Sequence, residues 1–406
     1  MKLVSIFLIF ATSCLFAADW PQWGGPNRNF QVKAPALLDQ WPQDGPKILW
    51  ETPLGRGYAG IVTKGDVLYT SFQKDDMDTT VALSSKKEGK VIWSKAYPSH
   101  TLEGHVLQFG KAPNTTPLIA GDALITVTFS GVMRAHNLKD GALLWTHDLI
   151  KDHGGKIHKF GYSISPILYK GNVIALIGGK EGIAAINPKT GDFVWKSPTY
   201  DTTYASPKIF KINGEDQIVF WGGEDIRGVD ASNGAPLWDY PISNQYKNHG
   251  SDPILIGDGL ILAPSQMQSA TRALKISKAD GAYKVEEAWF NNKVKNHHWN
   301  IIHIGDHLYF SIGETTSFVA CVEAATGKIV WQERGFNMIN SIYADNKIIF
   351  TDHDGMLGLA RISPKGFDLI GKMPLLKKTA RTPPTLVGST LYARDEKRLV
   401  AIDFSK

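Results

Sequence analysis

The chain of 406 residues is 43% hydrophobic and 20% charged, with a formal net charge of +5. These values are typical of a globular protein and too weakly basic to indicate a nucleic-acid-binding surface. Its 39 glycines, 21 prolines and 12 tryptophans indicate many tight turns and many aromatic anchors. That combination favours an all-β protein built from short strands.

The N-terminal sequence MKLVSIFLIFATSCLFAADW has the layout of a secretory signal peptide, with Lys2 first, then an apolar run and then small residues before Asp19. We expect cleavage after residue 17 or 18 and export to the periplasm or the cell exterior. The alternative is lipoprotein processing with a lipid anchor on Cys14, but the aliphatic residue usual three positions earlier is absent. No later stretch is long and apolar enough to predict a membrane span.

Cys14 and Cys321 are the two cysteines of the chain. Removal of the signal peptide would leave one cysteine, so we expect no internal disulfide. The sequence contains no CxxCH motif for haem attachment.

Seven tryptophans recur at intervals of 42 to 52 residues and predict a repeat: Trp50, Trp93, Trp145, Trp195, Trp238, Trp289 and Trp331. Related phrases precede them, such as AHNLKDGALLW, AINPKTGDFVW and CVEAATGKIVW. Upstream of each phrase lie two apolar segments joined by a Gly-Asp or similar turn. Four short strands in each unit of 40–50 residues are typical of a β-propeller blade.

Counting the units predicts an eight-bladed propeller. Two further units follow Trp331, the first with Ile370 at the tryptophan position. The last unit, TPPTLVGSTLYARDEKRLVAIDF, stops after three strands, and the N-terminal segment GPKILWETPL can supply its fourth. An N-terminal strand that completes the C-terminal blade would close the ring and leave no exposed sheet edge.

The recurring phrase has a structural explanation. Thr190 and Gly191 provide a tight bend, and each tryptophan ring is expected to pack against the neighbouring blade. We therefore interpret the seven tryptophans as docking groups between blades, and we look for function in another part of each repeat.

The pattern A-x-[DN]-x-x-T-G-x-x-x-W, matched at every defined position from Ala185 to Trp195, resembles the tryptophan-docking repeat of the PQQ-like propeller superfamily. The resemblance covers most of residues 46–406. It implies either a quinoprotein dehydrogenase, with pyrroloquinoline quinone (PQQ) and calcium at the propeller axis, or a BamB-like protein that binds no quinone. The opening DWPQWGGPNRNF is similar to secreted bacterial PQQ-like repeat proteins. The chain lacks the adjacent cysteine pair and the fused haem domain of many such dehydrogenases, and their calcium ligands and catalytic aspartate have no residue-by-residue match here.

The segments that enter the innermost strands should form a polar ring around one mouth of the axial channel. The candidate ligand-binding residues of this mouth are Tyr58, Asn114, Ser163, Tyr204, Asp252, His298, Trp299, Asn300, Asn340 and Arg381. Converging hydroxyl, amide and aromatic groups can form a site for a polar ligand. The alternative is that these groups bond each other and water.

Asp252 and Asn300 are the candidate calcium ligands, although they fall short of the six to eight oxygens that calcium takes. If a quinone did bind, Asp252 could serve as the general base and Trp299 could stack on the quinone ring. His249, His297 and His298 lie in successive long connections and could meet as zinc ligands. The alternative is that these histidines are solvated or cap turns.

The sequence thus predicts a signal peptide (1–18), a leader (19–45) packed across the propeller surface, and the propeller itself (46–406). The expected function is a non-catalytic binding or scaffolding protein, monomeric, with a protein or glycan partner and no nucleic acid. A glycan would rest on Trp20, Trp23 and Trp299 if they are exposed. The alternative is a PQQ- and calcium-dependent oxidoreductase of the alcohol or sugar dehydrogenase type.

Overall fold

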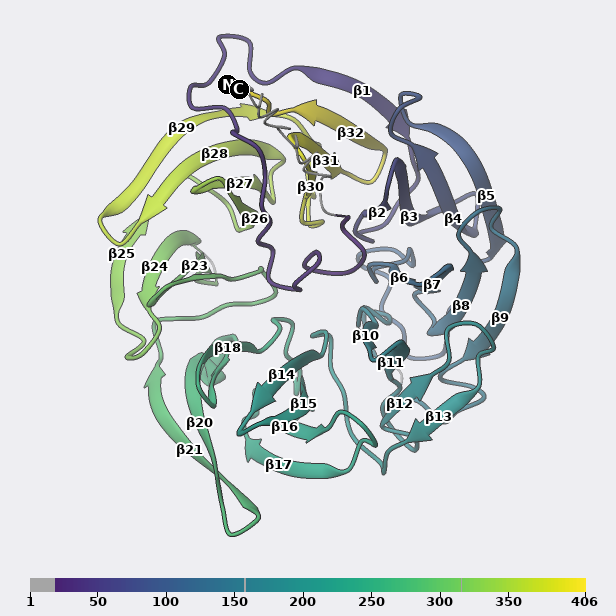
Figure 1. Cartoon of the computed structure of the whole chain (residues 1–406), viewed down its shortest axis with the longest axis vertical. Coiled ribbons are helices and arrows are strands. Elements are labelled where there is room, and N and C mark those ends of the chain that lie inside the picture. The colour runs from purple at the N-terminus through teal and green to yellow at the C-terminus, as the bar shows by residue number, and fades with distance from the viewer. Residues whose placement is uncertain (1–18, 157, 315) are drawn as a thin grey trace, which may run out of the picture.

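The computed structural model describes residues 19–406, except residues 157 and 315. Its strands form eight four-stranded antiparallel sheets that follow one another around a ring (Figure 1), so the predicted eight-bladed propeller is confirmed. One short 3-10 helix, Met267–Ser269, is the helical element of the described residues. The predicted signal peptide and Cys14 lie outside those residues.

In each blade the first strand lies innermost and the fourth outermost. Blade 1 comprises β2 (Val62–Lys64), β3 (Val67–Lys74), β4 (Met77–Ser84) and β5 (Lys90–Pro98). Blade 2 comprises β6 (Leu118–Ala120), β7 (Ala123–Val127), β8 (Val132–Asn137) and β9 (Leu143–Asp148). Blade 3 comprises β10 (Ile167–Tyr169), β11 (Asn172–Leu176), β12 (Ile183–Ile186) and β13 (Phe193–Lys196). Blade 4 comprises β14 (Lys208–Ile212), β15 (Glu215–Trp221), β16 (Asp225–Asp230) and β17 (Pro236–Pro241).

The second half of the ring repeats the arrangement. Blade 5 comprises β18 (Ile254–Gly257), β19 (Leu260–Ala263), β20 (Thr271–Ala279) and β21 (Ala282–Asn291). Blade 6 comprises β22 (Ile302–Ile304), β23 (His307–Ile312), β24 (Phe318–Glu323) and β25 (Ile329–Glu333). Blade 7 comprises β26 (Ile339–Ala344), β27 (Lys347–Asp352), β28 (Met356–Ser363) and β29 (Gly366–Pro374). Blade 8 comprises β30 (Thr385–Val387), β31 (Thr390–Arg394), β32 (Arg398–Asp403) and β1 (Ile48–Pro53).

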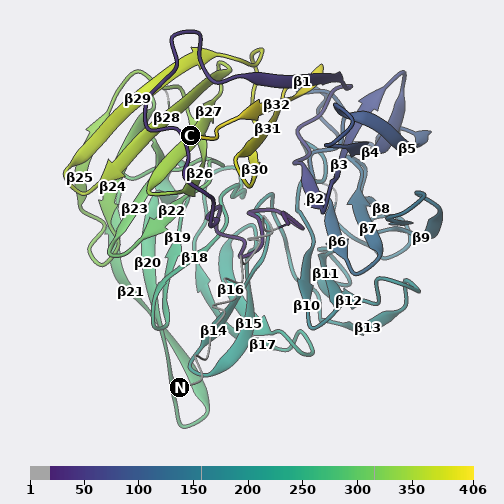
Figure 2. The same ribbon diagram turned by 45° about the horizontal axis from the view of Figure 1, so that its top comes forward.

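The ring is closed by the N-terminal strand, as predicted. Strand β1 pairs antiparallel with β32 (Figure 2), and Trp50 lies opposite Ala401. Just before the strand pair, the Asp403 N–H donates to the Lys47 carbonyl oxygen at 2.9 Å. The join between the two ends of the chain therefore lies inside a sheet, where backbone hydrogen bonds hold it.

The recurring tryptophans share one position in their blades. Each stands in the outer strand opposite a small residue of the third strand, and the strand register shifts there by one residue. Trp145 shows the arrangement: it pairs with Ala135, and its indole N–H donates to the Pro188 carbonyl of the next blade at 2.9 Å. A Cβ atom added to Gly191 would lie 2.8 Å from the Trp145 ring. The Trp145 ring therefore packs directly on the backbone of Gly191, where a side chain would collide with it. Gly191 also adopts a positive φ of 81°, which glycine tolerates best.

Trp238 departs from this arrangement. Its indole N–H donates to Gln217 of its own blade at 2.7 Å. The next blade presents the long β20–β21 hairpin, whose turn at Asp280 and Gly281 lies beyond Ala279 and Ala282, so no T-G turn meets the ring. Trp238 still packs in an apolar cluster with Ile276 and Tyr283 of that hairpin.

The structure corrects the assignment in the seventh blade. Gly371, one residue after Ile370, is the residue opposite Leu359 where the register shifts, and so it holds the tryptophan position. The ring comes from the leader instead: a Cβ atom at Gly371 would overlap the Trp41 ring. The leader therefore supplies the aromatic side chain that this blade lacks, which fixes the leader to the outer edge of the ring.

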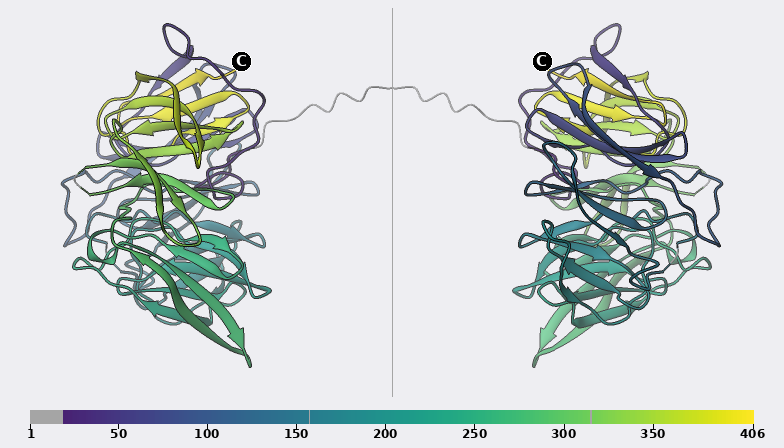
Figure 3. Two further views of the ribbon diagram at one scale, coloured as in Figure 1. Left: turned by 90° about the vertical axis from the view of Figure 1, so that its left-hand side faces the viewer. Right: turned by 90° about the vertical axis from the view of Figure 1, so that its right-hand side faces the viewer.

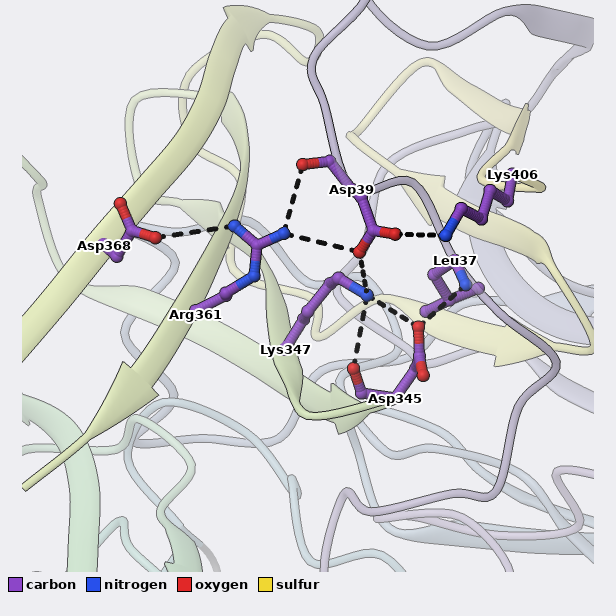
Figure 4. Close-up of polar contacts among 7 residues, drawn as sticks. All are labelled: Leu37, Asp39, Asp345, Lys347, Arg361, Asp368 and Lys406. Atoms are coloured by element: carbon purple, nitrogen blue, oxygen red, sulfur yellow. Dashed lines mark hydrogen bonds and ion pairs between the residues drawn. The ribbon is translucent and has the colours of Figure 1, made fainter.

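An ionic cluster holds the leader next to this position (Figure 4). The Asp39 carboxylate pairs with Lys347 at 3.0 Å, with Lys406 at 2.5 Å and with Arg361 at 3.4 Å. Hydrogen bonds from Lys406 and Lys347 hold the pKa of Asp39 below its usual range. The cluster thus joins the leader to blade 7 and to Lys406.

Candidate functional site

The leader crosses one end of the propeller axis. It passes in front of the centre of the ring in Figure 1, and both views of Figure 3 place it on one side of the disc. Its main chain bonds the inner strands as it passes: the Thr63 N–H donates to the Trp20 carbonyl at 2.8 Å, and the Tyr343 N–H donates to the Phe30 carbonyl at 2.9 Å. The leader thus spans the axis from blade 1 to blade 7 and covers that end.

Asp252, the candidate catalytic and calcium-binding carboxylate, bonds the leader and its neighbouring blade. Its Oδ2 accepts the indole N–H of Trp23 at 2.7 Å and lies 3.2 Å from the Lys208 ammonium. Its Oδ1 accepts the Ser206 backbone N–H at 2.9 Å. Lys208 is 7% exposed and also donates to the Arg28 carbonyl at 2.5 Å. Burial lowers the Lys208 pKa, and the charge of Asp252 opposes that shift.

Asp252 is also the last member of a chain of bonds between blades. At equivalent positions, a backbone N–H of one blade donates to the side-chain oxygen of the next blade at 2.9–3.1 Å. The residues linked in this way are, in order, Gly60, Thr116, Ser165, Ser206 and Asp252. These side chains therefore hold the first five blades together around the axis.

Beyond the fifth blade, side chains still link neighbouring blades, but the N–H of the later blade donates to the side chain of the earlier one. The Asn300 amide oxygen accepts the Ser341 N–H at 2.8 Å, and its amide nitrogen donates to the Ser341 carbonyl at 2.7 Å. The Asn340 side chain donates to the Arg381 carbonyl at 2.9 Å. Much of the polar ring expected from the sequence is thus bonded to itself, as the alternative interpretation held.

Asp252 and Asn300 do not fit a calcium site in this arrangement. Calcium takes six to eight oxygens, whereas both oxygens of Asp252 and the amide oxygen of Asn300 already accept hydrogen bonds. Among the described residues, no group of three or more His, Cys, Asp or Glu side chains could hold a metal ion. No catalytic step through PQQ and calcium can therefore be derived from these groups.

The other end of the axis is lined by the segments that enter the inner strands. Tyr58, Asn114, Ser163, Tyr204 and Arg381 are all half-buried there. The Ser163 hydroxyl donates to the Tyr204 carbonyl at 3.4 Å, and the Tyr204 hydroxyl accepts the backbone N–H of residue 160 at 3.2 Å. No described residue bonds the buried Nε of Arg381. We call this end the open mouth.

Aromatic side chains surround the Arg381 guanidinium at the open mouth. It lies 4.5 Å from the centre of the Phe109 ring and 5.6 Å from that of Tyr58, within cation–π range. Phe109 is 43% exposed and Leu107 49% exposed, both in the connection before β6, and Tyr246 is 61% exposed in the connection before β18. Phe109 thus presents an exposed aromatic ring beside the half-buried Arg381, and Tyr246 presents a second one on another connection. The sequence analysis named Arg381 and Tyr58 but missed Phe109, because the long connection carries no repeat pattern.

The three histidines proposed to meet at a zinc ion have separate environments. His249 is buried, stacks on Trp221 with ring centres 3.9 Å apart, and bonds the Ser265 hydroxyl at 2.8 Å. His297 and His298 contact each other with ring centres 4.6 Å apart. Burial lowers the pKa of all three imidazoles. With no third ligand in the described residues, the zinc hypothesis is not supported by the geometry.

The tryptophans suggested as a glycan surface are not on the surface. Trp20 is 2% exposed and Trp299 is 3% exposed, while Trp23 is half-buried under the leader. The leader folds back over its own aromatic side chains, which hydropathy alone did not reveal. The prediction that these tryptophans form an exposed platform for a glycan is therefore wrong, although Trp23 and Trp299 both line a cavity.

That cavity has a volume of about 640 Å³ and lies between leader residues 26–31 and the inner strands of blades 3 to 6. The sequence analysis did not predict it, because the leader segment that forms one wall lies more than 100 residues before the strands that form the others. One signal was present: the inner strand KIFKI begins with a lysine, Lys208, at a buried position.

Comparison with known proteins adds the family. The profile described as outer membrane protein assembly factor BamB matches residues 41–208 and 202–333. Among curated proteins, the quinoprotein alcohol dehydrogenase PedH of Pseudomonas putida (strain KT2440) is 28% identical over 135 residues, which is 30% of this chain and 21% of PedH. BamB of Shewanella oneidensis (strain MR-1) is 24% identical over 183 residues, 45% of this chain and 42% of that protein. The matched segments thus span less than half the length of either curated relative.

Among solved structures, BamB from Moraxella catarrhalis superposes with a TM-score of 0.61 at 15% identity, over 88% of this chain and all of that chain. At this level of identity, the superposition shows a shared fold alone. In the described part of the chain, no helix is long and apolar enough to cross a membrane.

Proposed function

Because the chain belongs to the family described as outer membrane protein assembly factor BamB, we propose that it is a non-catalytic scaffolding propeller. It is exported to the bacterial periplasm or the cell exterior, in keeping with its signal-like N-terminal sequence. It binds a protein partner through the connections that surround the open mouth.

The bonding of Asp252 carries this proposal. A general base or a calcium ligand needs a carboxylate oxygen that can face a substrate or an ion. Here Trp23, Ser206 and Lys208 occupy both oxygens, and a leader segment covers that end of the axis. The carboxylate stabilises the leader and the joint between two blades, so its conspicuous position has a structural explanation.

The open mouth supplies the groups of a protein-binding surface. Aromatic residues and arginine are enriched at the centres of protein interfaces, where they contribute most of the binding energy. Phe109 and Tyr246 are exposed on long connections, while Arg381 is held between the Phe109 and Tyr58 rings. Because the inner strands hold the ends of these connections at fixed spacing, the surface is largely formed before a partner arrives.

Photo-crosslinking in cells tests the partner surface. A photoreactive amino acid replaces Phe109 or Tyr246 in the full chain, and Val91, exposed on the outer strand of blade 1, serves as the control position. The proposal predicts that positions 109 and 246 capture the same protein, that position 91 does not, and that Arg381→Glu reduces the capture at least about tenfold. Equal capture at all three positions, or none at 109 and 246, contradicts it.

The oxidoreductase alternative rests on the sequence match to PedH and has its own test. Purified residues 19–406 are titrated with PQQ, with and without excess calcium, and followed by calorimetry and absorbance. The scaffold proposal predicts neither heat nor a spectral change. Micromolar, calcium-dependent binding would instead support a quinoprotein, and Asp252→Ala would be the next variant to measure.

A further inference from the structure

The cavity beneath the leader is separate from the proposed partner surface, which lies at the opposite end of the axis. Its volume of about 640 Å³ falls within the range of about 300–1,000 Å³ that is usual for small-molecule sites. Residues 26–31 of the leader form one wall, and the ends of β10, β14, β18 and β22 form the others. The groups in these walls define which ligand the cavity can hold.

The cavity wall carries an excess of positive charge. Arg28, Lys170 and Lys208 are the three cations of the lining, and Asp252 is its one carboxylate. The Arg28 Nε donates to Gln22 and its Nη2 donates to the Leu168 carbonyl, which leaves Nη1 without a hydrogen bond to any residue in the described ranges. Lys208 uses two of its three donors. An anionic group in the cavity could accept hydrogen bonds from the remaining donors of both Arg28 and Lys208.

Two imidazoles lie in the same wall. The Nε2 atom of His298 is buried and bonds no residue that the structure describes, whereas the backbone at Gly305 and Leu255 lies within hydrogen-bonding reach of the His303 ring. Burial lowers the pKa of both rings, so both are neutral at pH 7. A neutral imidazole nitrogen donates or accepts according to its tautomer, and a hydroxyl group can pair with it in either case.

Aromatic side chains form part of the remaining lining, beside aliphatic and amide side chains. Trp23, Tyr169, Phe210 and Trp299 all contribute to the wall, and Trp299 is 3% exposed. Flat apolar faces of this kind cover the C–H surface of a saturated ring while the polar groups bind its substituents. Cations, an imidazole nitrogen and aromatic faces thus meet in one partly open cavity.

We infer that this cavity binds a small hydroxylated carboxylate of the sugar-acid class, with the acid group between Arg28 and Lys208 and a hydroxyl group at His298. The leader supplies Arg28, so the ligand also strengthens the attachment of the leader to the propeller. The inference does not depend on the partner proposed for the open mouth, because no residue of the open-mouth cluster lines the cavity.

Calorimetric titration of purified residues 19–406 with digalacturonate at pH 7 tests the inference. Its dimethyl ester has the same rings without the charge, and inorganic phosphate has charge without the rings. We expect digalacturonate to bind at least about tenfold more tightly than either, with affinity falling as salt screens the charges. Equal binding of acid and ester, tighter binding of phosphate, or no heat with the acid overturns the inference.

Matched variants separate the cavity from the leader's overall charge. Arg28→Gln removes the cavity guanidinium, whereas Lys33→Gln removes an exposed leader charge outside the cavity. We expect at least about tenfold weaker binding for the first and unchanged binding for the second. Because Arg28 also holds the leader, Lys170→Gln at the exposed rim gives an independent reading, with a loss of about two- to threefold. Equal affinity in all four proteins contradicts the assignment.

Discussion

Replacing Asp252 by asparagine should destabilise the protein without abolishing a chemical activity. The side chain keeps its shape, and its amide oxygen can still accept the Ser206 N–H. It loses the negative charge 3.2 Å from the Lys208 ammonium, which is 7% exposed. It also loses the acceptor of the Trp23 indole N–H, because an amide nitrogen replaces Oδ2. Removal of one partner from a buried ion pair leaves the other charge uncompensated, at a cost of about 3–5 kcal/mol.

An independent upper limit on the loss of stability in Asp252→Asn has a similar value. Lys208 can avoid the cost by releasing its proton, and neutralising a lysine with an ordinary pKa of 10.5 at pH 7 costs about 5 kcal/mol. The destabilisation by Asp252→Asn therefore cannot greatly exceed this value. It should also shrink at higher pH, because the proton that Lys208 must release is then held less strongly.

Denaturant unfolding at pH 7, followed by tryptophan fluorescence, measures the effect in Asp252→Asn, in Lys208→Met and in the double variant. The double variant should lose at least about 2 kcal/mol less than the sum of the single losses, because neither charge is then left alone. Asp258→Asn, an exposed carboxylate in the turn after β18, is the control and should cost less than about 0.5 kcal/mol. A loss of that small size for Asp252→Asn, or additive losses in the cycle, would refute the reasoning.

Two further predictions concern the repeat and the buried histidines. Gly191→Ala should cost about 3 kcal/mol and Gly171→Ala about 1 kcal/mol in the same unfolding assay, because both glycines have positive φ but only Gly191 contacts a docked ring, that of Trp145; equal losses would show that the ring does not rest on Gly191. Burial lowers the pKa of His158 to about 4, so the unfolded chain binds a proton that the folded chain rejects, and stability present above pH 6.5 is lost as the pH falls from 6.5 towards 4. The slope of stability against pH in that range should decrease in His158→Phe, and an unchanged slope would mean that His158 is protonated in the folded protein.

The architecture could be predicted because the repeat is defined by residue types at short, fixed spacings. Each blade needs a small residue, a glycine turn and a tryptophan at fixed spacing, and these remain visible in the sequence even where one member varies. The prediction failed at Ile370 by one residue, because a register shift inside the strand pair decides which position faces the neighbouring blade. Trp41 fills that position from 330 residues away in the chain, and no local pattern could indicate such a contact.

The candidate site shows the same division. The sequence placed Asp252, Asn300 and the other polar residues at the start of their inner strands, since strand positions follow from the period of the repeat. Which atoms they bond depends on distances between blades, and those distances turn the expected ligand ring into bonds that join the blades.

The sequence by itself therefore determined the number of blades, their order and the closure of the ring, because hydrophobic period and turn residues act over a few positions. Only the tertiary structure decided that the leader folds across the axis, that its Trp23 bonds the Asp252 carboxylate, and that it forms one wall of a cationic cavity. These features depend on packing and charge between segments far apart in the chain, for which the sequence carries no spacing rule.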